Sequence, residues 1–76
     1  MNRYVLMCWV EDFNGNRHTQ LSLVGTSTKL ESYLRVVKRA ATNLEERRKI
    51  LGEEEFKNIY SIRRIEYLYT PVKYVA

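Results

Sequence analysis

The chain has 76 residues and a formal net charge of +4, with an ordinary hydrophobic content, one proline and three glycines. This length predicts one small domain spanning residues 1–76, and the composition excludes a disordered chain and a polybasic nucleic-acid arm. The single cysteine, Cys8, excludes an internal disulfide, and the sequence offers no Cys/His cluster for a metal and no glycine-rich loop for a cofactor phosphate.

A β-hairpin begins the chain. Residues 3–10 are mostly aromatic, β-branched or otherwise apolar, and residues 17–25 alternate between apolar and polar types, so both segments are predicted to be strands. Between them lies the dipeptide Asn14-Gly15, which favours a two-residue turn because both positions tolerate positive φ.

The length of this turn decides which face of the first strand is buried. A two-residue turn places Cys8 opposite Leu21 and directs Val5, Met7 and Trp9 to the face away from the core. A three-residue loop would invert the first strand and bury those three side chains instead. We favour the two-residue turn, which predicts a core face made of Tyr4, Leu6, Cys8, Val10, Leu21 and Leu23.

A long amphipathic helix follows, from Thr28 to Gly52. Thr28 and Glu31 match a capping box, and Gly52 suits the left-handed conformation of a helix C-cap. About 23 helical residues span about 35 Å, whereas an eight-residue strand spans about 27 Å, so the helix is predicted to overhang the sheet or kink near its end. Its apolar side carries Leu30, Tyr33, Leu34, Val37, Ala41, Leu44 and Leu51.

The last third of the chain predicts a helical stub anchored by Phe56 and Ile59, and then a third strand over residues 62–70 that ends at Pro71. A short extension from Val72 to Val75 is predicted to follow the proline. The helix returns the chain to the start of the second strand, so the third strand can pair antiparallel with the first. The predicted fold class is α+β: a small two-layer ββαβ domain with an antiparallel sheet of order 2-1-3 and one long helix packed on one face.

One face of this sheet is the predicted partner-binding surface. A single helix cannot cover both faces, so Val5, Met7 and Trp9 form an apolar patch, the kind of feature that marks an interaction site. Tyr67 and Tyr69 join the candidate contact residues, because tyrosine combines a rigid apolar body with a polar tip. The alternatives are that the C-terminal segment covers this face and that the tyrosines only pack on a neighbouring strand.

Basic residues suggest a second kind of surface, one that contacts nucleic acid. The charge of +4 is modest, however, and Glu31–Arg35 and Glu45–Lys49 have the spacing of ion pairs on a solvated helix. Arg48 interrupts the apolar stripe and is predicted to snorkel or to pair with an acid after Gly52. The candidate phosphate contacts are Arg35, Lys38, Arg39, Arg47, Arg48, Lys49, Arg63 and Arg64.

Catalysis has little support in the sequence. His18 lies beside the turn, and Glu11 is its expected neighbour across the hairpin. Such a pair could serve a small ribonuclease-type toxin, which we keep as a remote alternative, but a cross-strand polar pair is far commoner. Cys8 is expected in the core and unreactive. No catalytic residue, metal site or cofactor is therefore predicted.

These observations favour a small cytoplasmic protein-binding module, regulatory or inhibitory, that occupies a surface of a larger partner protein. A complete small reading frame of this kind would suit a modulator encoded by a virus or mobile element. Self-association, through the same face or through a sheet edge, is compatible with it. The apolar run from Tyr4 to Val10 is too short for a membrane span. The main alternative is nucleic-acid binding through the basic helix and the tyrosine-bearing strand.

Overall fold

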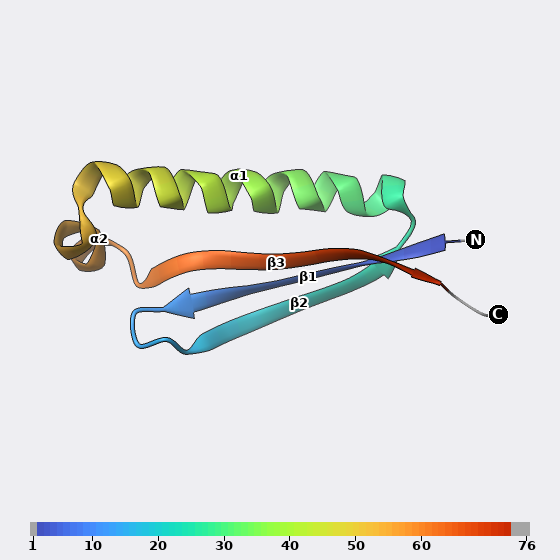
Figure 1. Cartoon of the computed structure of the whole chain (residues 1–76), viewed down its shortest axis with the longest axis horizontal. Helices are drawn as coiled ribbons and strands as arrows, with labels where there is room; N and C mark the ends of the chain where they lie inside the picture. Colours follow the sequence, from blue (N-terminus) through green and yellow to red (C-terminus); the bar gives the residue numbers. More distant parts are fainter. Residues whose placement is uncertain (1, 74–76) are drawn as a thin grey trace.

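The protein has two layers, a three-stranded sheet and a long helix that runs along it (Figure 1). The computed structural model describes residues 2–73, apart from the side chains of Thr19, Gln20 and Lys73. The sheet is antiparallel with the order β2-β1-β3, so the predicted ββαβ class and strand order are confirmed. The elements are β1 (Asn2–Asp12), β2 (Arg17–Gly25), α1 (Ser27–Leu51), α2 (Glu53–Ile59) and β3 (Ile62–Lys73).

The central strand, β1, has the two faces that the sequence predicts. Leu6 pairs with Leu23 and Cys8 pairs with Leu21, as expected for this hairpin. Side chains directly opposite each other point to the same face of a sheet. Leu6 is fully buried under α1, so this face is the covered one, and the odd-numbered residues of β1 point to the other side.

The turn between β1 and β2 is one residue longer than predicted. The Asp12 N–H donates to the Asn16 carbonyl at 2.9 Å, and the Gly15 N–H donates to the Asp12 carbonyl at 3.2 Å. Gly15 has a φ of 85°. Asp at the first position and a positive-φ glycine at the fourth are typical of the three-residue hairpin loop built on a type I turn. The expectation of a two-residue Asn14-Gly15 turn is therefore wrong.

A β-bulge in β2 compensates for the extra turn residue. Near the turn Val10 pairs with His18 and Glu11 with Arg17, and the register shifts between Val10 and Cys8. The single residue Trp9 of β1 therefore lies opposite two residues of β2, which is the arrangement of a β-bulge. Beyond Trp9 the register is the one expected from a two-residue turn. The predicted pairing of Glu11 with His18 is wrong, because Arg17 takes the place of His18.

Helix α1 begins and ends with caps that the sequence identifies only in part. Its N-cap is Thr26, whose Oγ1 accepts from the Lys29 N–H at 3.4 Å, so the predicted capping box at Thr28 is wrong. Gly52 is the C-cap, as expected, and its N–H donates to the Arg48 carbonyl at 3.0 Å. Its φ of 82° and ψ of 159° differ from the left-handed helical conformation that was predicted.

Strand β3 runs through Pro71, which was expected to end it. Pro71 lies opposite Tyr4 of β1, and β3 continues to Lys73. A proline is tolerated there because β3 is an edge strand. The strands are longer than predicted, but the last turn of α1 still extends past the beginning of β3, so the predicted overhang is confirmed (Figure 1). Just before this overhang, Arg48 and Ile65 line a common cavity. The predicted extension to Val75 passes beyond the described residues.

The core is thin and the molecule elongated. Among the described residues, three hydrophobic side chains are buried: Leu6, Leu30 and Phe56. The radius of gyration is 14.9 Å, whereas a compact chain of this length would have about 11 Å. Phe56 of α2 closes the turn end of the core, where it packs against Tyr60 at 4.6 Å and Phe13 at 5.9 Å between ring centroids. Ile59, its predicted companion anchor, is exposed.

No helix within residues 2–73 combines the length and the apolar character that crossing a membrane requires.

Candidate functional site

The face of the sheet opposite α1 carries an apolar surface centred on β1. Val5 and Met7 occupy the central strand, with Val24 of β2 opposite Val5 and Leu68 of β3 opposite Met7. Val24 is 45% exposed and Leu68 is 49% exposed, while the two central side chains are half-buried. Within residues 2–73 the chain places no element over this face, because β3 pairs with the edge of β1. We call these four residues the open face.

Trp9 borders the open face on the side of the turn, and polar groups hold it in place. Its indole N–H donates to a carboxylate oxygen of Glu66, the residue opposite it on β3. The guanidinium of Arg17 lies 5.1 Å from the centre of the indole ring, a cation–π arrangement, and its Nη2 is 3.2 Å from the same carboxylate. Trp9 is thus half-buried by its neighbours and fixed in one orientation.

Two further charged residues extend this polar border toward the turn. Arg64 is hydrogen-bonded to Glu11, its partner across β1 and β3, and its Nη2 lies 2.7 Å from Glu66. The hydrogen bond with Glu11 raises the pKa of Arg64. Two arginines and two glutamates therefore neutralise one another beside Trp9. We call Glu11, Arg17, Arg64 and Glu66 the charged border.

Tyr67 and Tyr69 do not belong to this surface. They pair with Cys8 and Leu6 on β1, so they point toward α1 and not toward the open face. Tyr69 stacks on Tyr4 with ring centroids 5.5 Å apart. Its hydroxyl is buried and has no hydrogen-bond partner among the described residues, and burial raises its pKa. The structure thus separates the two tyrosines from Val5, Met7 and Trp9, with which they were grouped as partner contacts.

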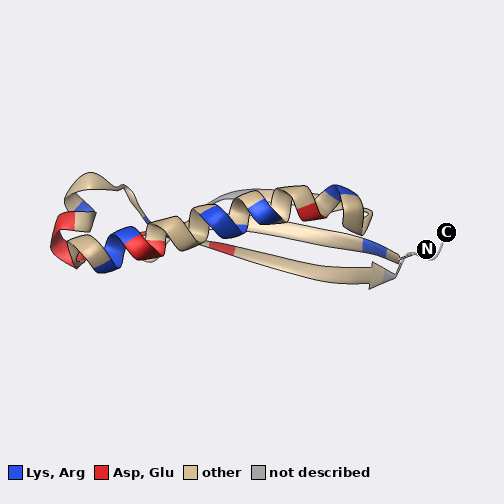
Figure 2. Ribbon diagram, turned by 90° about the horizontal axis from the view of Figure 1, so that it is seen from above, with Lys and Arg blue, Asp and Glu red and all other residues tan. Residues whose placement is uncertain are grey.

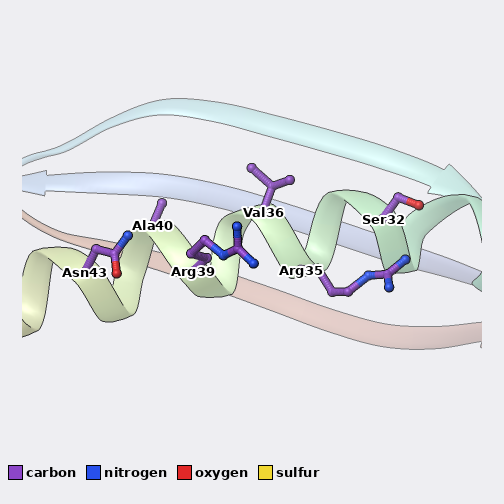
Figure 3. Close-up of a pocket in the computed structure, with 6 residues that line it drawn as sticks. All are labelled: Ser32, Arg35, Val36, Arg39, Ala40 and Asn43. Atoms are coloured by element: carbon purple, nitrogen blue, oxygen red, sulfur yellow. The ribbon is translucent and has the colours of Figure 1, made fainter.

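The candidate phosphate contacts fall into separate groups. Basic residues recur along the middle of α1, whereas acidic and basic residues alternate near its end and in α2 (Figure 2). Arg35 and Arg39 line an open hollow of about 510 Å³ on the outer side of α1, together with Ser32, Val36, Ala40 and Asn43 (Figure 3). The predicted ion pair between Glu31 and Arg35 is not formed within the described residues.

The remaining basic candidates are scattered or already paired. Arg48 lies 3.3 Å from Glu45 and 3.8 Å from Glu53, which confirms its predicted pairing with an acid after Gly52. The sequence predicted that Glu45 would pair with Lys49, but in the structure Glu45 pairs with Arg48. Adjacent strand residues point to opposite faces, so Arg64 lies in the charged border while Arg63 points to the other side. Arg47 and Lys49 are exposed on α1.

His18 belongs to the turn. Its Nε2 lies 2.6 Å from Oδ2 of Asp12, while Oδ1 of Asp12 accepts the backbone N–H groups of Asn14 at 2.8 Å and Asn16 at 2.9 Å. These hydrogen bonds, that of His18 first, lower the pKa of Asp12. All four residues therefore have evident roles in shaping the turn.

Cys8 is half-buried on the helix-facing side of β1, and burial raises the pKa of its thiol. A raised pKa leaves less thiolate at neutral pH and so favours an unreactive side chain.

Sequence reasoning missed the outer members of the surface. Leu68 and Glu66 were not singled out, because the register of β3 against β1 depends on where the chain re-enters the sheet after α2. Once Met7 is known to lie opposite Leu68, the alternation of β3 places both residues on the open face. Arg17 was missed for a similar reason, since the bulge in β2 moves it beside Trp9.

Comparisons with protein families, with curated proteins and with solved structures find no match to this chain.

Proposed function

We propose that the protein is a small cytoplasmic protein-binding module whose open face docks on a larger partner protein, which it regulates or inhibits by occupying that surface. The observation that supports this proposal is the apolar character of a central strand on the side that carries no helix. Val5 and Met7 on β1 contribute no polar group to that side, and Val24 and Leu68 extend the apolar area to both neighbouring strands. Water contact with this area is unfavourable, so burying it against a partner stabilises a complex.

The chemistry of the border fits an interface. Tryptophan and arginine are the residues that most often dominate binding energies, and Trp9 is held rigid by Arg17 and Glu66 before any partner arrives. A pre-ordered side chain loses little conformational entropy on binding. The paired charges around it can exchange some of their contacts for groups of a partner at the rim, where water remains accessible.

The test is capture of a partner from extract of the native cells by the immobilised full chain, with and without nuclease. Leu68→Lys places a charge in the open face, and Ile50→Lys places the same charge on an exposed position of α1. We expect Leu68→Lys to weaken capture at least about 30-fold, the effect of losing about 2 kcal/mol at an interface, and Ile50→Lys to leave it unchanged. Equal capture by the two variants would refute the open face as the binding site.

Nucleic-acid binding is the second candidate, and one observation favours it. Arg35 and Arg39 lie one turn apart beside Ser32 and Asn43, and neither arginine forms an ion pair within residues 2–73. Lys38 is also exposed, so three cations and two neutral hydrogen-bonding side chains are available on one stretch of α1. Such groups position a phosphate backbone without reading its sequence.

A further inference from the structure

The two edges of the sheet differ in how well they resist pairing with another strand. The β3 edge carries Pro71, and α1 packs more closely on β3 than on β2. The β2 edge contains no proline, and its one charged residue, Arg17, stands at its first position. Prolines and charges along an edge are the usual protection against strand addition. From Leu21 to Gly25 the β2 edge has neither.

Apolar side chains flank this edge on both faces of the sheet. Leu21 is 43% exposed although it points to the face that α1 covers, and Val24 is exposed on the open face. On α1, Val36 is 69% exposed and points to the side of β2 (Figure 3). Tyr33 is exposed one turn earlier on the same flank. The helix therefore leaves the β2 side of its own sheet face incompletely covered.

We propose that a second copy of the chain pairs with this edge, strand β2 against strand β2 in antiparallel orientation about a two-fold axis. The result is a six-stranded sheet with both helices on one face. A second copy fits this position because it brings its own Val36 and Tyr33. These side chains, together with those of the first copy, cover Leu21 and Leu23 on the helix-facing side of β2. Isologous pairing of this kind uses the same patch on both subunits and closes as a dimer.

The distribution of charge selects the antiparallel orientation. In a parallel pair Arg17 would face Arg17 of the partner subunit, and like charges directly opposite destabilise a sheet. In an antiparallel pair centred on Ser22, each Arg17 extends past the end of the opposing strand. The same register places Leu21 of each copy opposite Leu23 of the other, which gathers four leucines beneath the two helices. The bulge opposite Trp9 limits the new ladder to a short stretch.

The dimer does not rest on the proposed function, but it changes the surface available to a partner. Three strands about 4.8 Å apart and about 36 Å long present roughly 500 Å² on one face, less than the ~800 Å² that each side of a standard interface buries. Joining two sheets along β2 doubles this area and makes the two open faces continuous.

The first test is the mass of the full chain in solution by sedimentation equilibrium. We expect twice the chain mass for the wild type, and the single-chain mass for Leu21→Lys, whose charge lies beside the pairing edge. Leu68→Lys introduces the same charge at a similarly exposed position on β3 and should remain dimeric. Circular dichroism establishes that both variants fold. A monomeric wild type, or a dimer lost in Leu68→Lys and kept in Leu21→Lys, overturns the proposal.

The second test uses the symmetry of the pairing. A residue on the two-fold axis lies opposite itself, so Ser22→Cys in a Cys8→Ser background should form an interchain disulfide under mild oxidation. Ser32→Cys, exposed on the outer side of α1, is the matched control and should remain reduced. Equal crosslinking of the two variants, or none in a protein of dimeric mass, overturns the pairing of β2 with itself.

Discussion

Asp12 decides the shape of the hairpin turn. One carboxylate oxygen accepts two backbone N–H groups, those of Asn14 and Asn16, and the other binds His18. These contacts satisfy backbone groups that a loop would otherwise leave to water, and they hold the chain in the conformation that Gly15 completes. A single side chain at the end of β1 therefore fixes where β2 begins.

The lowered pKa of Asp12 makes this turn sensitive to acid. Its ordinary value is 3.8, and the folded protein holds it below that. The stabilisation is therefore complete above 3.8 and is lost as the pH falls through the lower folded pKa. We expect an NMR titration of the Asp12 carboxyl carbon to show a midpoint below 3.8 in the wild type.

His18→Ala removes the largest cause of this shift, so it should bring the midpoint back toward 3.8. Asn14→Ala leaves the side chain of His18 in place and retains the backbone N–H that Asp12 accepts, so it should move the midpoint much less. A wild-type midpoint at or above 3.8 would contradict the role given to the hydrogen bonds.

The sequence already contains the signal for the longer turn. Asp12 stands three residues before Gly15, the spacing of a type I turn with Asp first and glycine fourth. Asn14-Gly15 gives the competing signal of a two-residue turn, and local pattern alone does not rank the two. The faces of β1 were nevertheless predicted correctly, because the bulge opposite Trp9 cancels the extra turn residue. Trp9, which lies opposite the bulge, donates to Glu66 of β3, a contact that a local reading of the hairpin does not include.

At the scale of the elements, Gly52 joins two helices that would otherwise run together. It is the C-cap of α1 and the N-cap of α2, and the redirection there lets Phe56 close the core. Its φ of 82° with a ψ of 159° lies in a region that is essentially restricted to glycine. An ordinary left-handed cap would also accept asparagine.

We therefore expect Gly52→Ala and Gly52→Asn to destabilise the protein by a similar amount, about 1–3 kcal/mol. A Cβ at this position meets no atom within 4 Å, so the cost is conformational and not steric crowding by neighbours. Urea unfolding of both variants measures it, with Ser61→Ala in the loop before β3 as the control. Clearly higher stability of the asparagine variant would show that position 52 takes the left-handed helical conformation.

The elements themselves were predictable because each one has a strong periodic pattern. Residues 3–10 and 17–25 read as strands, and the apolar spacing from Leu30 to Leu51 reads as a helix. The ends were less predictable, since Thr26 and Thr28 both offer a capping hydroxyl and propensity does not choose between them. Pro71 misled for a related reason: a proline ends a central strand, but strand position within the sheet is a tertiary property.

For the molecule as a whole, the two predicted layers are correct, but the predicted interface residues lie on both faces of the sheet and not on one. Leu6 lies beneath α1 while Met7 lies on the open face, as the alternation of β1 requires. Tyr67 and Tyr69 were misplaced because their face depends on the register of β3, which the chain sets only after α2. The thin core was not predicted, because the number of buried side chains depends on how α1 lies along the strands (Figure 1).

The salt dependence of binding distinguishes the two proposed functions for the whole molecule. If Arg35, Lys38 and Arg39 contact about three phosphates, the logarithm of DNA affinity should fall with the logarithm of salt with a slope of about −2.7. Raising salt fourfold would then weaken binding about 40-fold, a loss that fluorescence anisotropy on labelled duplex measures directly. Replacing the three residues with glutamine should remove this salt dependence, because without the three cations no counterions are released from the DNA phosphates.

Arg48→Gln is the matched control for that measurement. It removes one charge, but Arg48 already pairs with Glu45 and Glu53, so the slope should be unchanged. Absence of measurable duplex binding at low salt would eliminate the second candidate. Docking through the open face, in contrast, buries Val5, Met7, Val24 and Leu68, whose contribution to affinity does not depend on counterion release. A partner affinity that is nearly constant over the same salt range would support docking through the open face.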